Sequence, residues 1–76
     1  MLKKWQRTEI SKTLTALSQL LEEPLETVYT TTNDRSKIVS FDKYNTSIVL
    51  TDDEVICNLK VYTTKLMNKL SNKEEL

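Results

Sequence analysis

The residues best suited to contact another molecule lie at the start of the chain. Lys3, Lys4 and Arg7 surround Trp5, the single tryptophan of the 76-residue sequence. Trp and Arg are enriched among the residues that contribute most to protein binding, so this cluster suits a protein partner. An aromatic ring among cations also suits nucleic acid, through base stacking and attraction to phosphate. We therefore predict that these four residues bind a partner.

The position of Trp5 decides whether it can do so. In a continuous helix, Trp5 lies about 140° around the axis from Ile10, away from the apolar stripe that faces the core, and is exposed. If the chain before Thr8 is not helical, Trp5 instead folds back onto the sheet edge or the second helix. We take this packed placement as the default expectation and keep the exposed one open.

Enzyme chemistry has few of its usual groups in this chain. The sequence contains no His, no Gly and one Cys. This excludes imidazole acid–base catalysis, Ser-His or Cys-His nucleophile pairs and glycine-rich phosphate loops. Cys57 has no base to activate it, so we expect a small packed hydrophobe on the same helix face as Val61. We predict no enzyme activity, no catalytic residue and no cofactor.

Three adjacent carboxylates, Asp52, Asp53 and Glu54, raise the question of a metal site. Adjacent side chains on a helix point in different directions, and no second acidic cluster lies at ligand spacing. Helix capping accounts for these residues better. Thr51 and Glu54 form a capping box, and acidic residues favour the positive end of the helix dipole. We predict the start of a helix here and no metal site.

That helix is expected to span residues 52–70, followed by a frayed tail over 71–76. From Val55 to Leu70, apolar residues recur at intervals of four, three, four and four, which is a helical pattern. This stripe consists of Val55, Leu59, Tyr62, Leu66 and Leu70.

Another helix is predicted over residues 8–22. Its apolar stripe consists of Ile10, Leu14, Leu17 and Leu21. Thr8 is the expected N-cap, although the helix could begin nearer Leu2, and Pro24 ends the segment because the residue before proline avoids the helical conformation.

The middle of the chain reads as three strands, over residues 27–32, 37–42 and 46–50. These segments are rich in β-branched and aromatic residues, and the connections between them contain Asn, Asp and Ser. Such short connections predict antiparallel neighbours. Because the chain has no Gly, we expect Asn or Asp at any position with positive φ.

Together these elements predict a single α+β domain over residues 1–76. Its two layers follow the order α-β-β-β-α, with a three-stranded antiparallel meander covered on one face by two amphipathic helices. Both sheet faces carry apolar residues. We expect Ile38, Ile48, Leu50 and Val28 on one face, with Tyr29, Val39, Phe41 and Val49 on the other. A second apolar face favours a homodimer, because small antiparallel sheets normally show water a polar face.

Charge separates the function classes further. The chain has 11 basic and 11 acidic residues, for a formal net charge of zero, and the charges fall in blocks of opposite sign. Such blocks suit protein–protein complementarity, whereas nucleic-acid binders usually carry a basic excess. We predict a small protein-interaction module that regulates or inhibits a larger protein. The alternative is a dimeric nucleic-acid-binding protein that uses the basic N-terminal patch.

Residue usage suggests where such a protein works. No segment approaches the roughly 20 apolar residues of a membrane helix, and no apolar stretch follows the basic start as in a signal peptide. The usage favours Lys over Arg, nine against two, which would suit a low-GC bacterium or its phage. We expect a cytoplasmic bacterial or phage protein with no membrane contact.

Overall fold

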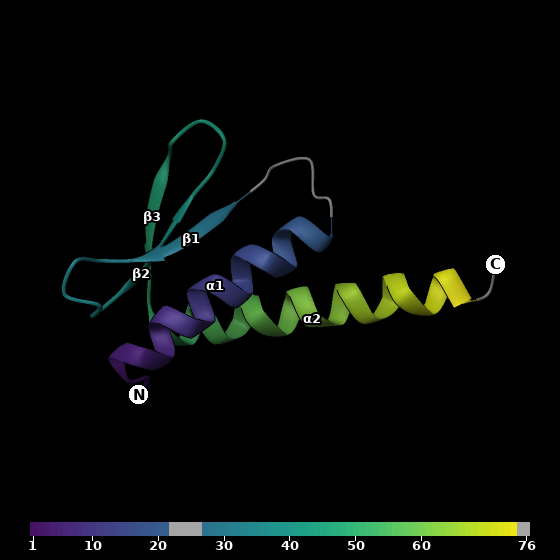
Figure 1. Ribbon diagram of the computed structural model, residues 1–76, viewed down its shortest axis with the longest axis horizontal. Coiled ribbons are helices and arrows are strands. Elements are labelled where there is room, and N and C mark those ends of the chain that lie inside the picture. Colours follow the sequence, from purple (N-terminus) through teal and green to yellow (C-terminus); the bar gives the residue numbers. More distant parts are fainter. Residues whose placement is uncertain (22–26, 75–76) are drawn as a thin grey trace.

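The computed structural model describes residues 1–21 and 27–74 of the chain. Two helices flank three strands along the sequence (Figure 1). Their bounds are α1 Lys4–Leu20, β1 Val28–Thr31, β2 Ile38–Phe41, β3 Ser47–Leu50 and α2 Asp52–Glu74. The α+β fold predicted from the sequence is confirmed, and each strand lies inside its predicted range.

The sheet is an antiparallel meander in the order β1-β2-β3. Tyr29 pairs with Ser40, which in turn pairs with Ile48, and directly paired residues point to the same face. This register places Tyr29 on the inner face, toward the helices, and Val28 on the outer face. The prediction had these two residues the other way round, because the sequence alone did not reveal the register between β1 and β2.

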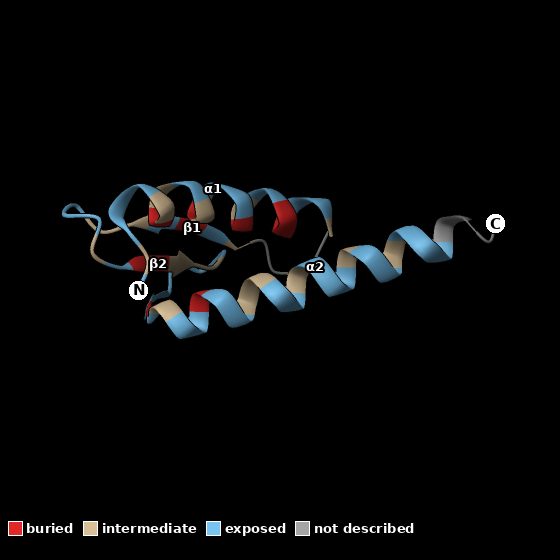
Figure 2. Cartoon of the chain, turned by 90° about the horizontal axis from the view of Figure 1, so that it is seen from below, coloured by how far each residue is buried: buried red, intermediate tan, exposed pale blue. Residues whose placement is uncertain are grey.

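The core lies between the inner face and the two helices. It is built from Leu14 of α1, Tyr29, Ile38 and Leu50 of the sheet, and Val55 of α2. In Figure 2 the buried positions of α1 lie on the side toward the sheet, and those of α2 are confined to its first turns. The helices therefore cover one face of the sheet, as predicted.

Helix α1 begins at Lys4, four residues before the expected N-cap Thr8. The backbone N–H of Lys3 donates to Gln6 Oε1 at 2.7 Å, which stabilises the earlier start, while the Thr8 hydroxyl donates back to the Lys4 carbonyl. Trp5 therefore lies on a continuous helix and is 62% exposed, so the packed placement is wrong. The helix ends at Leu20, and Pro24 lies outside the described residues.

Helix α2 begins as predicted. The Thr51 N–H donates to Glu54 Oε1 at 3.0 Å and the Glu54 N–H donates to the Thr51 hydroxyl at 3.2 Å, so the capping box is confirmed. The helix continues to Glu74, four residues past its predicted end at Leu70, because no Gly or Pro interrupts it.

The far half of α2 extends past the end of α1 (Figure 1). Lys69 Nζ donates to the Leu20 carbonyl at 3.3 Å, which links α2 to the end of α1. Met67 and Leu70 are more than half exposed. The apolar stripe of α2 therefore enters the core only in its first half, and the prediction of Leu70 in that stripe's packing is wrong.

Two tyrosines meet inside the fold. The hydroxyls of Tyr29 and Tyr62 lie 2.8 Å apart, and their rings meet edge to face. Burial, aided by the hydrogen bond to Tyr62, raises the pKa of Tyr29. Tyr62 packs against the core, as its place in the apolar stripe predicted, and Tyr44 is exposed in a loop.

Both sheet turns contain one residue with positive φ. Asn45 has φ 63°, in line with the prediction, whereas Arg35, with φ 60°, holds this position in the first turn in place of Asn or Asp. Asp34 stabilises that turn differently, because its Oδ1 accepts hydrogen bonds from the Thr32 hydroxyl and from the N–H and hydroxyl of Ser36. The carbonyl of Arg35 is held from outside the turn, as described below.

Candidate protein-interaction surfaces

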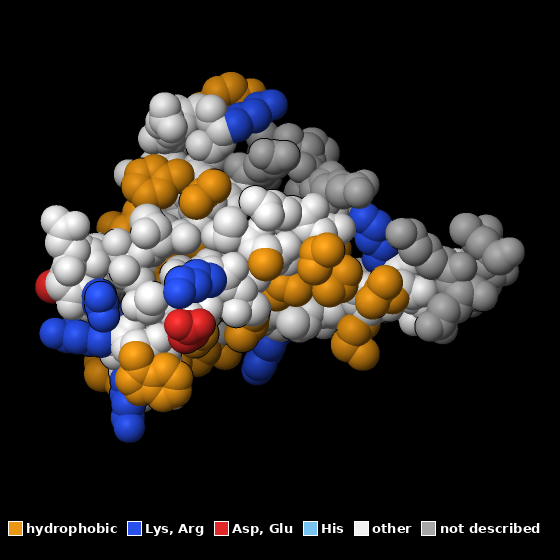
Figure 3. All heavy atoms as spheres, in the orientation of Figure 1, with side chains coloured by type: hydrophobic (Ala, Val, Ile, Leu, Met, Phe, Trp, Pro, Cys, Tyr) orange, Lys and Arg blue, Asp and Glu red, His pale blue; other side chains and the backbone are white. Residues whose placement is uncertain are grey.

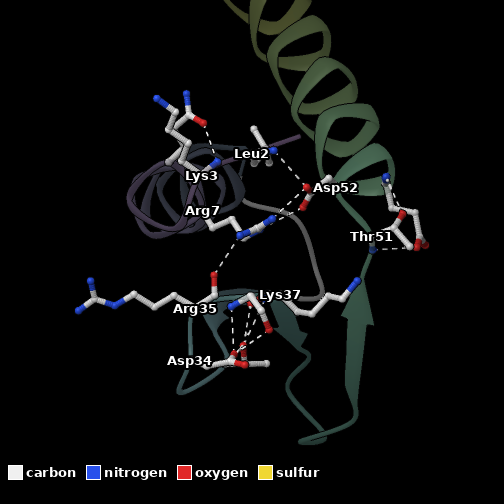
Figure 4. Close-up of polar contacts among 12 residues, drawn as sticks. Leu2, Lys3, Arg7, Asp34, Arg35, Lys37, Thr51 and Asp52 are labelled. Atoms are coloured by element: carbon white, nitrogen blue, oxygen red, sulfur yellow. Dashed lines mark hydrogen bonds and ion pairs between the residues drawn. The ribbon is translucent and has the colours of Figure 1, made fainter.

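Arg7 is the centre of a polar network that joins three parts of the chain (Figure 4). Its Nε and Nη2 donate to the two carboxylate oxygens of Asp52, each at 3.1 Å, and its Nη1 donates to the Arg35 carbonyl at 3.2 Å. The N–H of Leu2 donates to the same carboxylate at 3.2 Å. These bonds tie the N-terminus, the first sheet turn and the start of α2 together.

This network removes Arg7 from the exposed cluster in which the sequence placed it. Arg7 is 9% exposed, and the side chains of the pair are 11% and 20% exposed. The hydrogen bonds from Arg7 lower the pKa of Asp52 below its ordinary value. A bidentate, largely buried ion pair of this kind positions the backbone rather than a ligand.

Lys3, Lys4 and Trp5 remain exposed at the same end of the molecule. Hydrogen bonds from Ser36 and Thr32 lower the pKa of Asp34 to about 2, and the nearby charge of Lys4 adds to this shift. The fold thus brings the N-terminal lysines beside the β1–β2 turn, where Arg35 and Lys37 are also exposed. Figure 3 shows basic side chains gathered at this end of the molecule.

An open depression of about 670 Å³ lies beside the Arg7–Asp52 pair. Apolar side chains of Met1, Leu2 and Ile56 line it together with polar groups. Arg7 and Asp52, which also line the depression, already bond to each other, so this pair offers a ligand little specific attraction.

The outer face of the sheet is another surface with exposed apolar side chains. Within residues 1–21 and 27–74, both helices pack against the opposite face, so Val28 and Val49 are 51% and 57% exposed. Phe41, which pairs with Val28, is half-buried, and Val39, which pairs with Val49, is 9% exposed. An antiparallel sheet with one face on the core usually carries polar residues on the other, and here that face is largely apolar.

The two edges of the sheet differ. Along β1, the Tyr29 N–H donates to the Thr15 hydroxyl at 2.9 Å, and the Tyr29 carbonyl lies 3.3 Å from the same hydroxyl. Ser18 accepts a weaker bond from the Thr27 N–H. Helix α1 thus blocks this edge with its own side chains. On β3, Ile48 and Val49 are both more than half exposed, and the β2–β3 loop projects away from the helices (Figure 1).

Cys57 is exposed on α2, and Val61 beside it is 45% exposed. The expectation of a packed cysteine is therefore wrong, because the helix turns this side away from the sheet. Among the residues that the structure describes, no group of three His, Cys, Asp or Glu is placed to hold a metal ion.

Comparison with protein families, with curated proteins and with solved structures finds no match for this chain. No helix within the described part of the chain has the length and apolar character needed to cross a membrane. Any functional assignment therefore rests on the surfaces described above.

Proposed function

We propose that this chain is a small, non-enzymatic protein-interaction module that docks on a larger protein through the outer face of its sheet. The observation that supports this proposal is the apolar character of that face, which no described helix covers. Its apolar side chains are the exposed Val28 and Val49, the half-buried Phe41 and the nearly buried Val39. An exposed apolar surface of this kind is typical of a binding site, since burying it in a complex removes it from water.

The charge distribution is consistent with a protein partner. A net charge of zero gives little general attraction to nucleic acid, whereas local blocks of either sign can match a complementary protein surface. The module would regulate or inhibit its partner by occupying a surface with which the partner otherwise contacts other molecules. We propose further that it acts as a homodimer in the cytoplasm of a bacterium or of a phage-infected cell.

Capture from a lysate with matched variants tests this proposal. Val28→Lys places a charge on the outer face, whereas Val61→Lys changes a similarly exposed valine on α2, outside the sheet. We expect the unchanged chain and Val61→Lys to retain one protein in near-stoichiometric amount after nuclease treatment, and Val28→Lys to lose it. Retention by Val28→Lys, or loss of the protein with nuclease, would contradict docking through this face.

A second candidate function is supported by one observation. Lys3 and Lys4 lie at the same end of the molecule as Arg35 and Lys37 of the β1–β2 turn, so the basic surface is larger than the sequence indicated. Such a surface, with Trp5 exposed beside it, could hold phosphates and stack on a base.

The salt dependence of binding tests this second candidate. Replacing Lys3, Lys4 and Lys37 by Ala should weaken binding to duplex or single strands and reduce its salt dependence, because fewer counterions are released. Arg7 is left unchanged, since its loss would disturb the fold. If the unchanged chain shows no salt-sensitive binding to either form, this function is excluded.

A further inference from the structure

The strand register shows in which direction the backbone N–H and C=O groups of the two edge strands point. The bonds to Thr15 show that the N–H and C=O of Tyr29 point away from β2. In an antiparallel ladder this direction alternates from residue to residue. Through the pairs of Tyr29 with Ser40 and of Ser40 with Ile48, the N–H and C=O groups of Ser47 and Val49 must point out of the open edge of β3.

The side chains of β3 do not protect this edge. Folded proteins usually block an exposed strand edge with charged residues, with proline or with a covering helix. Strand β3 has the sequence Ser-Ile-Val-Leu, which contains neither a charge nor a proline, and Ile48 and Val49 are exposed on opposite faces. β1, by contrast, receives side-chain hydrogen bonds from α1 along its edge. The β3 edge is therefore built to accept another strand.

We propose that β3 pairs with β3 of a second copy of this chain, antiparallel and about a two-fold axis, to form a continuous six-stranded sheet. This inference rests on the proposed function, because it supplies the second copy which that proposal requires. Two registers satisfy the outward groups, one with Val49 opposite Val49 of the second copy and one with Val49 opposite Ser47. Both place the exposed apolar side chains of the two strands side by side.

Charge complementarity favours a second copy over an unrelated strand. In the antiparallel arrangement, the β2–β3 loop of each copy lies alongside the start of α2 of the other copy. The loop carries Lys43, whose Nζ lies 5.2 Å from the centre of the Tyr44 ring, and the helix start carries the exposed Asp53 and Glu54. The symmetry therefore places a cation opposite two acids at both ends of the strand pair. A parallel pairing would place Lys43 opposite its own copy.

Edge pairing also leaves the outer face accessible. The outer faces of the two sheets join into one surface, which carries Val28, Val39, Phe41 and Val49 from each copy. A larger partner then meets twice the apolar surface that one chain offers. Stacking of two outer faces would instead bury the surface on which docking depends. The two modes of dimerisation can therefore be distinguished by which substitutions abolish the dimer.

Sedimentation of the purified chain, from low micromolar to near-millimolar concentration, tests the pairing. We expect the mass to reach twice the 8.9 kDa of one chain. Val49→Pro should remain a monomer, because it removes the outward N–H, while the monomer tolerates proline at an edge position whose N–H faces solvent. Val28→Lys, on the opposite edge strand, should still dimerise. A monomeric unchanged chain, or loss of the dimer with Val28→Lys, would overturn the proposal.

Charge exchange gives a test that leaves the strand unchanged. Lys43→Glu should weaken the dimer about tenfold, because attraction at both ends becomes repulsion. Adding Asp53→Lys in the same chain should restore the affinity, since each contact regains opposite charges. Failure of the double variant to recover would overturn the antiparallel arrangement. These experiments contain no partner protein, so their failure leaves the docking proposal to be judged by the capture of Val28→Lys.

Discussion

The two edges of the sheet differ in what their outward backbone N–H and C=O groups contact. Strands β1 and β3 have four residues each, and each lies at an edge of the sheet. On β1, Thr15 of α1 takes the place of a neighbouring strand by bonding the backbone of Tyr29. On β3, the outward groups of Val49 meet solvent in the single chain. Intramolecular contacts thus complete one edge of the sheet, and the other edge is the one at which we propose that a second copy binds.

The N-terminal end resembles the β1 edge, because its polar groups are also satisfied by contacts within the chain. There the Arg7 guanidinium, the Asp52 carboxylate, the Leu2 N–H and the Arg35 carbonyl satisfy one another. Polar groups that are matched in this way stabilise the single chain, because an unmatched buried group costs free energy. We therefore expect substitutions in this network and at the β1 edge to change stability, and substitutions at the β3 edge to change association.

The largest expected effect follows from breaking the ion pair. Asp52→Asn leaves the largely buried guanidinium of Arg7 without its carboxylate, and should lower the free energy of unfolding by about 2–3 kcal/mol. Glu9→Gln breaks the exposed pair with Lys12, at 3.6 Å, and should cost less than about 0.5 kcal/mol. Urea denaturation of both variants at low concentration measures the difference. Equal losses would contradict the assignment of Asp52 to a stabilising network.

Acid should weaken the same contact gradually. The pKa of Asp52 is lower in the folded chain than its ordinary value, so the unfolded chain takes up the proton first as the pH falls. The stabilisation is complete above the ordinary Asp pKa of about 3.9 and is lost as the pH falls through the folded pKa. Urea denaturation between about pH 6 and pH 2 should show this loss, with a shallower decline in Asp52→Asn. The pKa values of Asp34 and Glu54 are also lowered, and these residues contribute equally to acid destabilisation of the unchanged chain and of Asp52→Asn. Identical declines in stability would therefore show that Asp52 does not contribute.

A smaller effect is expected at the β1 edge. Thr15→Val keeps the shape of the side chain but removes the hydroxyl that accepts the Tyr29 N–H, so the free energy of unfolding should fall by about 1–2 kcal/mol. The exchange of the Tyr29 amide with solvent should become faster in the same variant. An unchanged exchange rate would show that Thr15 does not close this edge.

The smallest effect is expected at the β3 edge. Val49→Thr is the reverse exchange of a methyl for a hydroxyl, at a position that is 57% exposed. In the dilute monomer it should change the free energy of unfolding by less than about 0.5 kcal/mol. A loss as large as that of Thr15→Val would mean that the two edges contribute equally to the single chain.

The sequence predicted the elements well because their signals are local. Helical apolar stripes at both ends of the chain and β-branched runs between them predicted the fold, and the capping box of Thr51 and Glu54 predicted the start of α2. The end of α2 was missed because a tail without Gly or Pro carries no stop signal. The start of α1 lies nearer the alternative at Leu2 than the expected N-cap Thr8, because Gln6, rather than a typical N-cap residue, stabilises it.

The sites were harder to predict because they depend on contacts between distant parts of the chain. Arg7 was predicted to bind a partner because Lys4 and Trp5 lie next to it in the sequence. Its actual contact, Asp52, lies 45 residues away, so no local pattern indicated it. Tyr29 was assigned to the wrong face because a shift of one residue in strand register exchanges the faces. Thr15 gave no signal, because it lies about 140° around the helix axis from Ile10, off the apolar stripe, and nothing in the sequence linked it to β1.

Amide hydrogen exchange at Tyr29 and Val49, followed as a function of protein concentration, tests the comparison most directly. Both amides point out of the sheet, one toward Thr15 and the other toward the open edge. We predict slow exchange of the Tyr29 amide at every concentration. The Val49 amide should exchange rapidly when dilute and slowly when concentrated, as a second copy pairs with it. Rapid exchange of Val49 at all concentrations would contradict the pairing of β3 with a second copy.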